Sequence, residues 1–186
     1  MNILVASDIH GSPESLLFIL DKVRACRPDR VVLLGDLLYH GPRNPLPGGY
    51  GPKSMPDMFR TLMKLAPLTA VRGNCDAEVD CMLLPFPLAD SAQLCLDGLD
   101  IYVSHGHRIP ELPPMGNFMP GTVFLRGHTH VPRGESAGGF SFWNPGSLSL
   151  PKQGYPRSWA MIKDGIFSVY DMEGTRILSH APGSQA

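Results

Sequence analysis

Two histidines separated by one residue follow a short apolar stretch in the second half of the chain. Residues 123–125 predict a buried strand that Gly127 ends, and His128 and His130 come directly after it. Residues two apart point to the same side of an extended chain, so both imidazoles can face one point. Neutral imidazoles are common ligands of transition metals, and the stretch therefore favours a metal site. A pair of surface histidines on a loop is the alternative interpretation.

Polar residues of similar kinds follow several other apolar stretches. The full set is Asp8, His10, Asp36, Asn74, His105, His107, His128 and His130. A helix cap or a solvated loop residue explains one such position but not their repetition. Carboxylate, amide and imidazole ligands together suit Mn, Fe, Zn, Co or Ni. The set is too large for one tetrahedral ion, and pairs of ions about 3.5–4 Å apart recur in hydrolases of phosphate esters.

The first half of the chain alternates between predicted strands and helices. An apolar stretch from Asn2 leads into Asp8 and His10, and Ser12 followed by Pro13 predicts the start of a helix. A second apolar stretch at 31–34 precedes Asp36. This strand–helix–strand pattern predicts parallel strands. Ligands of such sheets bind beyond the carboxyl ends of the strands, where these polar residues lie.

Short predicted strands dominate the second half of the chain. A third early strand is expected at 68–71, before Asn74, and Asp76 is expected to cap a short helix or to accept hydrogen bonds near the site. After Pro87 the strand candidates are 94–96, 101–103, 123–125, 140–143, 160–162, 167–170 and 177–178. Few helices separate them, so many neighbours should be antiparallel. We expect one α/β domain of two stacked sheets over residues 1–181, with a loose tail at 182–186.

Composition argues against several classes of protein. The formal net charge of −1 lacks the basic excess of a nucleic-acid binder. Hydrophobic residues make up 43% and charged residues 18%, which are ordinary globular values, and no apolar stretch is long enough to cross a bilayer. The four cysteines form no Cys-x-x-Cys pair, which disfavours structural zinc and predicts reduced thiols in the cytoplasm.

Five short motifs, in this order, resemble those of the calcineurin-like metallophosphoesterases. They are Asp8-Ile9-His10, Gly35-Asp36, Gly73-Asn74-Cys75-Asp76, His105-Gly106-His107 and Gly127-His128-Thr129-His130. The blocks from His40 to Pro47 and from Asn144 to Lys152 are similar to those of the small bacterial YfcE-type phosphodiesterases. With them the resemblance covers nearly the whole chain.

The resemblance implies a fold and a set of roles. The fold would be a four-layer α/β/β/α sandwich of two mixed sheets. One metal would be held by Asp8, His10 and His130, the other by Asn74, His105 and His128, and Asp36 would bridge them. A hydroxide between the ions would attack the phosphorus of a small phosphodiester. Mn²⁺ is the expected activator, with Zn²⁺, Fe, Co²⁺ or Ni²⁺ as alternatives.

Other residues near these motifs are candidates for substrate binding and proton transfer. Many relatives carry a histidine, thought to donate a proton to the leaving group, where this chain has Cys75. His40 and Arg43 lie in a long loop after Asp36, and Arg43 either binds phosphate or faces solvent. His107 either contacts substrate or supports His105. We expect Asn144 and Ser147 to shape a turn, and we expect no function for His180.

Two other functions compete with a phosphodiesterase. Some relatives have lost metal ligands and become interaction scaffolds, but none of the seven implied ligands is replaced here. A nuclease is the second alternative, and the neutral charge argues mildly against it. No membrane partner is expected, and a homo-oligomer is compatible with the sequence.

Overall fold

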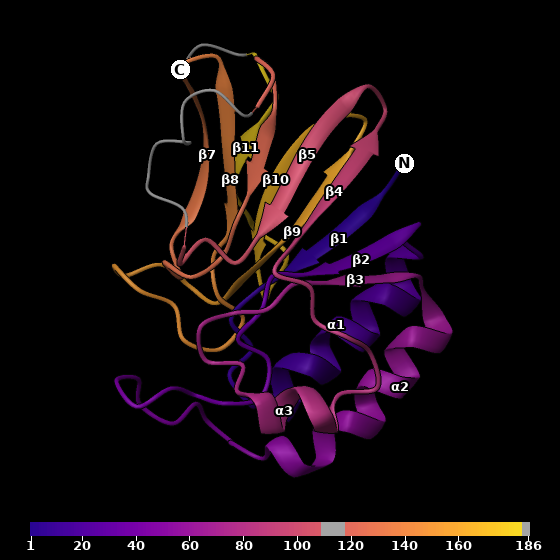
Figure 1. Ribbon diagram of the computed structural model, residues 1–186, viewed down its shortest axis with the longest axis vertical. Coiled ribbons are helices and arrows are strands. Elements are labelled where there is room, and N and C mark those ends of the chain that lie inside the picture. Colours follow the sequence, from indigo (N-terminus) through magenta and orange to yellow (C-terminus); the bar gives the residue numbers. More distant parts are fainter. Residues whose placement is uncertain (109–117, 184–186) are drawn as a thin grey trace.

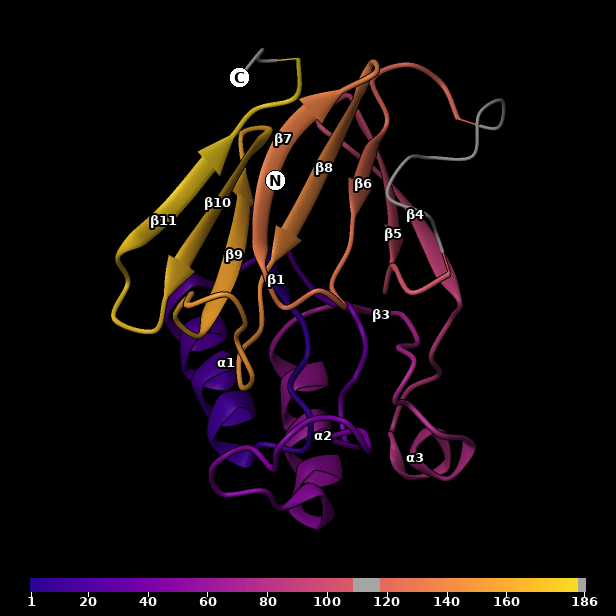
Figure 2. The ribbon, with the colours of Figure 1, turned by 90° about the vertical axis from the view of Figure 1, so that its left-hand side faces the viewer.

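The computed structural model describes residues 1–108 and 118–183 and contains two mixed β-sheets packed face to face (Figures 1 and 2). The six-stranded sheet has the order β11 (Arg176–His180), β10 (Ile166–Asp171), β9 (Ser158–Lys163), β1 (Ile3–Ala6), β2 (Arg30–Leu33) and β3 (Leu68–Ala70). The five-stranded sheet has the order β4 (Ser91–Leu96), β5 (Leu99–Ser104), β6 (Val123–Leu125), β8 (Phe140–Pro145) and β7 (Pro132–Ala137).

Strand directions agree with the pattern of connections in each half of the chain. β1, β2 and β3 are parallel, because a helix connects each to the next. The later strands form antiparallel pairs, β4 with β5, β7 with β8, β9 with β10, and β10 with β11. β6 is parallel to both of its neighbours, β5 and β8. The carboxyl ends of β1, β2, β3, β5 and β6 are therefore followed by the motifs found in the sequence.

Apolar residues form two cores. The first lies between the six-stranded sheet and the helices α1 (Pro13–Cys26) and α2 (Met55–Leu65), and Leu16, Phe59 and Leu62 are fully buried in it. The second lies between the sheets, where Trp143 of β8 stacks on Phe167 of β10 with ring centroids 5.0 Å apart. A 3₁₀ turn, Pro52–Ser54, precedes α2, and the short helix α3 spans Glu78–Leu83.

The predicted α/β fold with two mixed sheets is confirmed. Helices α1 and α2 form the layer on the outer face of the six-stranded sheet. In the described part of the chain, the outer face of the five-stranded sheet carries aromatic side chains in place of a helix. Tyr102, Phe118, Phe124 and Phe142 contact one another there.

Local predictions had mixed outcomes. Ser12 caps α1 as predicted, since its hydroxyl accepts a hydrogen bond from the backbone of Ser15. The prediction that Asp76 caps a helix was wrong, because α3 begins two residues later and Ala77 occupies its N-cap position. The sequence also favours Ser54 as the cap of α2, but its side chain makes no capping bond there, and its hydroxyl donates to the carbonyl of Gly51 instead.

Strand β7 was not predicted at all. Its sequence, from Pro132 to Ala137, contains Pro, Gly and charged residues, which are typical of loops. The strand lies at the edge of its sheet and begins with Pro132. A proline, which has no N–H to donate, is tolerated in that position. Of the predicted tail at 182–186, residues 184–186 lie outside the described residues. None of the helices in the described ranges is long and apolar enough to cross a membrane.

Candidate metal centre

The predicted ligands converge on one edge of the two sheets, where the loops after β1, β2, β3, β5 and β6 meet. The Asp8 Oδ1 atom lies 3.3 Å from His130 Nε2 and 3.8 Å from His10 Nε2. Metal-ligating atoms of Asp8, His10 and His130 all lie within 4.8 Å of one another, and all three side chains are buried. The side chains predicted to bind the first ion are thus close enough to share one.

A second cluster adjoins the first through Asp36. The Asp36 Oδ2 atom lies 3.4 Å from His105 Nε2 and 3.7 Å from His10 Nε2, so this carboxylate faces both clusters. The Asn74 Oδ1 atom lies 3.0 Å from the same His105 nitrogen. The ring of His128 packs edge-on against His105 with centroids 5.1 Å apart. Three groups of three His, Cys, Asp or Glu residues in the described chain have ligand atoms within 4.8 Å of one another, and His128 belongs to none of these groups.

The hydrogen bonds of the imidazoles fit a bound cation. In His10, His130 and His105, Nδ1 lies 3.0, 2.5 and 2.6 Å from the carbonyl oxygens of Tyr39, Leu150 and Leu34. A carbonyl oxygen can only accept, so Nδ1 carries the proton and a neutral ring has its lone pair on Nε2. When both rings are neutral, the Nε2 lone pairs of His10 and His130 face each other at 3.3 Å. A cation between these lone pairs would satisfy both.

Asp8 supports the same conclusion. Its Oδ2 accepts hydrogen bonds from the Ser7 hydroxyl and the His128 backbone, at 2.6 and 3.1 Å. Its Oδ1 is buried and has no hydrogen-bond partner among the described residues. A buried, unpaired carboxylate oxygen is costly unless an ion completes its surroundings.

Backbone conformation at the centre is unusual. Five of the candidate ligands have positive φ between 50° and 67°, the left-handed region that non-glycine residues rarely adopt: Asp8, His10, Asp36, His128 and His130. Each such residue costs on the order of 1–3 kcal/mol. Such strain persists where the surrounding structure enforces it, and it is concentrated at functional sites.

Two glycines of the motifs make room for the carboxylates. A Cβ on Gly73 would lie 2.1 Å from Asp36 Oδ1, and one on Gly127 would lie 1.9 Å from Ser7 Oγ and 2.9 Å from Asp8 Oδ2. Only a residue without a side chain allows the strands to bring these carboxylates to the centre.

The charges of the centre depend on one another. Burial alone raises the pKa of Asp8, but the adjacent ring of His130, 3.3 Å from Oδ1, and the charges of His105 and His10 outweigh burial and lower that pKa. Burial lowers the pKa of His105, yet Asp36 and Asp8 raise it overall to about 9. The pKa values of His107 and His128 are lowered, chiefly by burial. Carboxylates and imidazoles thus stabilise opposite charges on each other, as expected in a site for cations.

The loops of the centre are held by polar contacts behind the ligands. Asp76 accepts hydrogen bonds from the backbone of Asp36, Leu37 and Gly73, at 2.7–2.8 Å, which confirms the alternative prediction that it is an acceptor. Asn144 donates to the carbonyl of Gly127 and to the hydroxyl of Thr129, so it orders the turn that carries His128.

Ser147, Ser149 and Arg157 hold the loop that supports the Asp8 and His130 side of the centre. The hydroxyls of Ser147 and Ser149 donate to the carbonyl of Asp8 at 2.8 and 2.9 Å. Arg157 donates to the carbonyl of Leu148 and to Glu14 and Ser15 of α1. Sequence reasoning missed Arg157, because it lies outside the motifs and its partners on α1 are far away in the sequence.

The candidates for substrate binding lie around the centre. Cys75 Sγ lies within 4.8 Å of ligand atoms of His10 and Asp36, and accepts a hydrogen bond from Asn74. Chiefly through burial, the pKa of Cys75 is raised to about 12, so the metal-free protein carries a thiol there. A Cβ on Gly41 would lie 2.7 Å from Cys75 Sγ, so the loop of His40 passes over this thiol.

His40, His107 and Arg43 differ in their surroundings. The ring of His40 contacts Tyr39 and Tyr50 edge-on, and its Nδ1 is buried without a partner in the described chain. The ring of His107 lies 5.4 Å from that of His105. Arg43 is exposed, and its guanidinium makes no hydrogen bond or ion pair with the residues described.

Comparisons with known proteins give consistent results. A family model described as the calcineurin-like phosphoesterase superfamily domain matches residues 1–164. The chain is 39% identical over 181 residues to phosphodiesterase YfcE of Escherichia coli K12, covering 96% of each chain. It is 27% identical to the probable metallophosphoesterase YsnB of Bacillus subtilis, covering 95% of each. The solved structure of YfcE from E. coli aligns with a TM-score of 0.89 at 40% identity, covering 98% of this chain and 100% of that one.

Proposed function

This chain belongs to the calcineurin-like phosphoesterase superfamily, and from that premise we propose that it hydrolyses phosphate diesters with two divalent metal ions. The observation that carries the proposal is the position of Asp36, whose carboxylate faces His10 of one cluster and His105 of the other. The small phosphodiester as substrate class is supported by the 39% identity to phosphodiesterase YfcE.

The proposed ligands divide into two sets that share one carboxylate. Asp8, His10 and His130 hold the first ion, Asn74, His105 and His128 hold the second, and Asp36 contributes to both. When bound, the ions would lower the pKa of a shared water and neutralise charge that develops on the phosphoryl oxygens. The backbone carbonyls of Tyr39, Leu150 and Leu34 keep the protons of His10, His130 and His105 on Nδ1, so the Nε2 atoms remain available.

Residues around the ligands have proposed roles in binding substrate. His40 and Arg43 lie in the loop above Cys75, and Arg43 is available to hold a phosphoryl oxygen through its planar guanidinium. His107 contacts the ring of His105 and borders the pocket beside the centre, so it can both support that ligand and contact substrate. Cys75 occupies the position from which a leaving group would take its proton. Its high pKa makes it a weak acid there.

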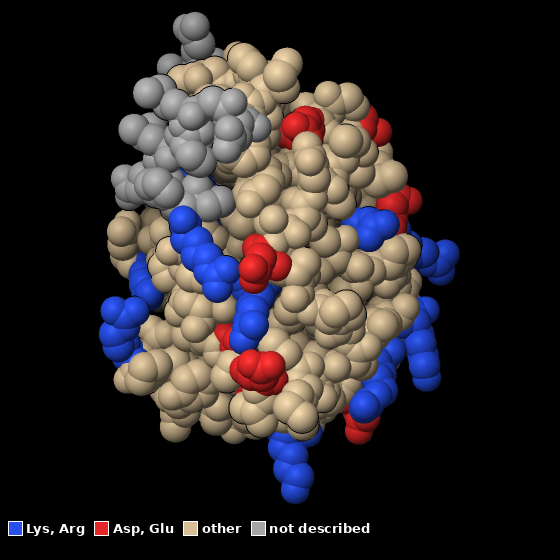
Figure 3. All heavy atoms as spheres, in the orientation of Figure 1, with Lys and Arg blue, Asp and Glu red and all other residues tan. Residues whose placement is uncertain are grey.

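The alternatives receive less support. A metal-free scaffold does not need the buried, unpaired Asp8 oxygen or the facing lone pairs of His10 and His130, both of which cost stability without a cation. A nuclease would favour a continuous basic surface. On the face shown in Figure 3, the Lys and Arg side chains of the described residues lie in separate groups among acidic and uncharged ones.

Compartment, metal and assembly belong to the proposal as well. All four cysteines are free thiols, which supports a reducing compartment such as the cytoplasm. Mn²⁺ is the proposed activator, because a site of mixed oxygen and nitrogen ligands accepts it. A homo-oligomer remains compatible with this function.

An activity screen tests the function. Protein reconstituted with Mn²⁺, Zn²⁺, Co²⁺ or Ni²⁺ is assayed against bis(p-nitrophenyl) phosphate, p-nitrophenyl phosphate, cyclic nucleotides and single-stranded DNA. We expect metal-dependent turnover of the small diesters, above that of the monoester and of DNA. Activity on none of the esters with any ion would contradict a hydrolase, and a preference for DNA would favour the nuclease.

The same assay tests the role of Arg43. Arg43→Ala should lower kcat/KM for diesters by about tenfold through KM, because it removes a charge-assisted contact to phosphate, and should leave metal content unchanged. Arg60→Gln is the matched control, since Arg60 is also exposed but lies on α2 and pairs with Asp57. Unchanged kinetics in Arg43→Ala would show that Arg43 is an ordinary surface residue.

A further inference from the structure

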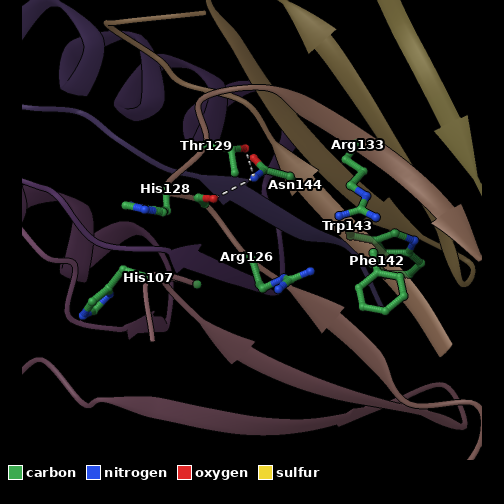
Figure 4. A pocket seen from close by; sticks show the side chains of 10 residues that line it. His107, Arg126, His128, Thr129, Arg133, Phe142, Trp143 and Asn144 are labelled. Carbon is green, nitrogen blue, oxygen red and sulfur yellow. Dashed lines mark hydrogen bonds between the residues drawn. The ribbon is translucent and has the colours of Figure 1, made fainter. Parts of the chain in front are cut away.

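A pocket of about 310 Å³ lies beside the candidate metal centre. His107 and His128 lie at one end of it, Arg133 and Phe142 at the other, and Arg126 between them (Figure 4). This volume is at the lower end of the range for small-ligand pockets, roughly 300–1,000 Å³. The pocket is therefore large enough for one substituent of a substrate rather than for a whole large ligand.

The two arginines lie at β6 and β7, the strands on either side of β8. Arg133 of β7 pairs with Asn144 of β8, and Arg126 directly follows β6, where its backbone N–H donates to the carbonyl of Trp143 at 2.9 Å. Leu125 and Trp143 face the core between the sheets. Side chains alternate along a strand, so Arg126 and Asn144 point to the opposite, outer face of the sheet.

Both guanidinium groups pack on one aromatic ring. The Cζ atoms of Arg126 and Arg133 lie 5.3 and 5.1 Å from the centroid of the Phe142 ring. Phe142 is 2% exposed and stacks on Phe124 with centroids 5.6 Å apart, so the ring has little freedom to move. Arg133 is further held by an ion pair with Glu135. The guanidinium groups are thus positioned before any ligand arrives.

The charge of the pocket is complementary to an anion. Its lining contains the guanidinium groups of Arg126 and Arg133, and no Asp or Glu is among the described residues that line it; Glu135 pairs with Arg133 beside the pocket. Arginine presents several N–H donors in one plane, which suits the oxygens of phosphate or carboxylate.

We propose that this pocket is a second anion-binding subsite, which holds a phosphate or carboxylate group of the substrate other than the phosphate being hydrolysed. The inference rests on the proposed function, because His128 belongs both to the pocket and to the predicted metal ligands. The preferred substrates are then diesters in which one alcohol carries a further oxyanion. Arg126 and Arg133 determine this specificity and take no part in bond cleavage.

Two matched substrates test the specificity. Thymidine 5′-(p-nitrophenyl phosphate) and its 3′-phosphorylated counterpart have the same scissile bond and leaving group, and differ only in the further phosphate. Wild-type protein should prefer the phosphorylated ester in kcat/KM by on the order of ten- to hundredfold, mainly through KM. A 3′-carboxymethyl derivative distinguishes carboxylate from phosphate as the preferred group.

Three variants assign the preference to the pocket. Arg126→Gln and the double variant Arg133→Gln/Glu135→Gln should bring the ratio of the two kcat/KM values close to one. The double variant removes both members of the ion pair, so an unpaired carboxylate cannot explain its effect. Arg60→Gln should keep the wild-type ratio. A wild-type ratio near one, or a ratio that survives both pocket variants, would overturn the subsite.

A binding measurement separates the subsite from the catalytic proposal. The full-length protein, treated with EDTA, is titrated with inorganic phosphate while the guanidinium N–H signals of Arg126 and Arg133 are followed by NMR. We expect these signals to shift saturably with phosphate concentration. The Arg126 signals should no longer shift in the double variant Arg133→Gln/Glu135→Gln. Absence of such shifts would contradict the subsite even if the enzyme cleaves diesters. Failure to cleave either nitrophenyl ester, with the shifts present, would instead contradict the proposed function and leave an anion site.

Discussion

Cys75 occupies the position where the resemblance to the family implies a proton-donating histidine. Its thiol lies beside His10 and Asp36, and burial is the main reason why its pKa is raised to about 12. A thiol with such a pKa remains protonated at neutral pH and donates weakly. Proton donation to a leaving group should therefore be poor, and esters of acidic alcohols such as nitrophenol should react far faster than alkyl esters.

The substitution Cys75→His tests this account. An imidazole at this position should raise kcat for alkyl diesters by more than kcat for nitrophenyl diesters, because only the former need a proton on the leaving oxygen. General acid catalysis is typically worth about 10²–10⁴ in rate, and a substituted group should recover part of it. Cys75→Ser is the control for size. Equal slowing of both substrate classes with metal still bound would show that Cys75 does not occupy the acid's position.

At the scale of residues, the types of the candidate ligands were readable from the sequence, but their support was not. Asp8, Asp36, His105 and the other candidate ligands were identified by their residue types and by their positions directly after predicted strands. The Nδ1 partners of three imidazoles are backbone carbonyls, such as that of Leu150 for His130. Every residue has a carbonyl, so no sequence signal marks these partners. Left-handed φ values at Asp and His residues are likewise set by the tertiary structure.

Among the structural elements, the loop between β8 and β9 connects the metal centre to α1. Ser147 and Ser149 of this loop bond to Asp8, Leu150 bonds to His130, and Arg157 joins Leu148 to Glu14 and Ser15. Because Arg157 donates to three acceptors on two elements, it fixes the loop relative to α1.

Arg157→Gln should therefore weaken metal binding on the Asp8 and His130 side. We expect calorimetry to show about a tenfold weaker Kd for one ion and an unchanged Kd for the other, since outer partners of metal ligands typically contribute 10–100-fold. Arg24→Gln, which removes an exposed pair with Asp21 on α1, is the control. Equal weakening of both ions, or of neither, would contradict the assigned role.

β11 contacts the other sheet through His180. The indole N–H of Trp143 donates to His180 Nδ1 at 2.9 Å, and Ser136 Oγ lies 3.2 Å from His180 Nε2. Burial lowers the pKa of His180 below its ordinary value of 6.5. The unfolded chain therefore takes up this proton more readily than the folded one, so the contribution of His180 is complete above pH 6.5 and is lost as the pH falls below it.

His180→Asn should reduce this pH dependence. An asparagine keeps an acceptor for Trp143 but does not titrate, so the free energy of unfolding should fall less between pH 7.5 and pH 5 than in the wild type. His180→Leu leaves the indole N–H without an acceptor and should cost about 1–3 kcal/mol at pH 7.5. Urea unfolding at both pH values measures these differences. An unaltered pH dependence in His180→Asn would contradict a neutral, buried His180.

Prediction of elements succeeded where the pattern was regular. Parallel strands separated by helices and the cap of α1 followed from apolar periodicity and from Ser12-Pro13. β7 was missed because an edge strand accepts Pro and Gly, and two roles stayed open for Asp76 because its backbone partners at Asp36 and Leu37 are distant in the sequence. Such long-range contacts depend on packing, which a local pattern does not report.

At the scale of the whole molecule, the interface between the two sheets defines the candidate centre. One sheet contributes Asp8, His10, Asp36 and Asn74 through its parallel strands, and the other contributes His105, His128 and His130. Neither sheet alone carries a complete set for either ion. Metal binding should therefore depend on the packing of the sheets, and bound metal should in turn stabilise that packing.

The central claim is that this interface binds two ions that share Asp36, and the stoichiometry of metal binding tests it most directly. Calorimetric titration and elemental analysis of reconstituted protein should give two divalent ions per chain. Asp36→Ala should weaken both and remove most diesterase activity, whereas Asp57→Ala, an exposed change on α2, should alter neither. One ion or none in the wild type, or full activity in Asp36→Ala, would contradict the account.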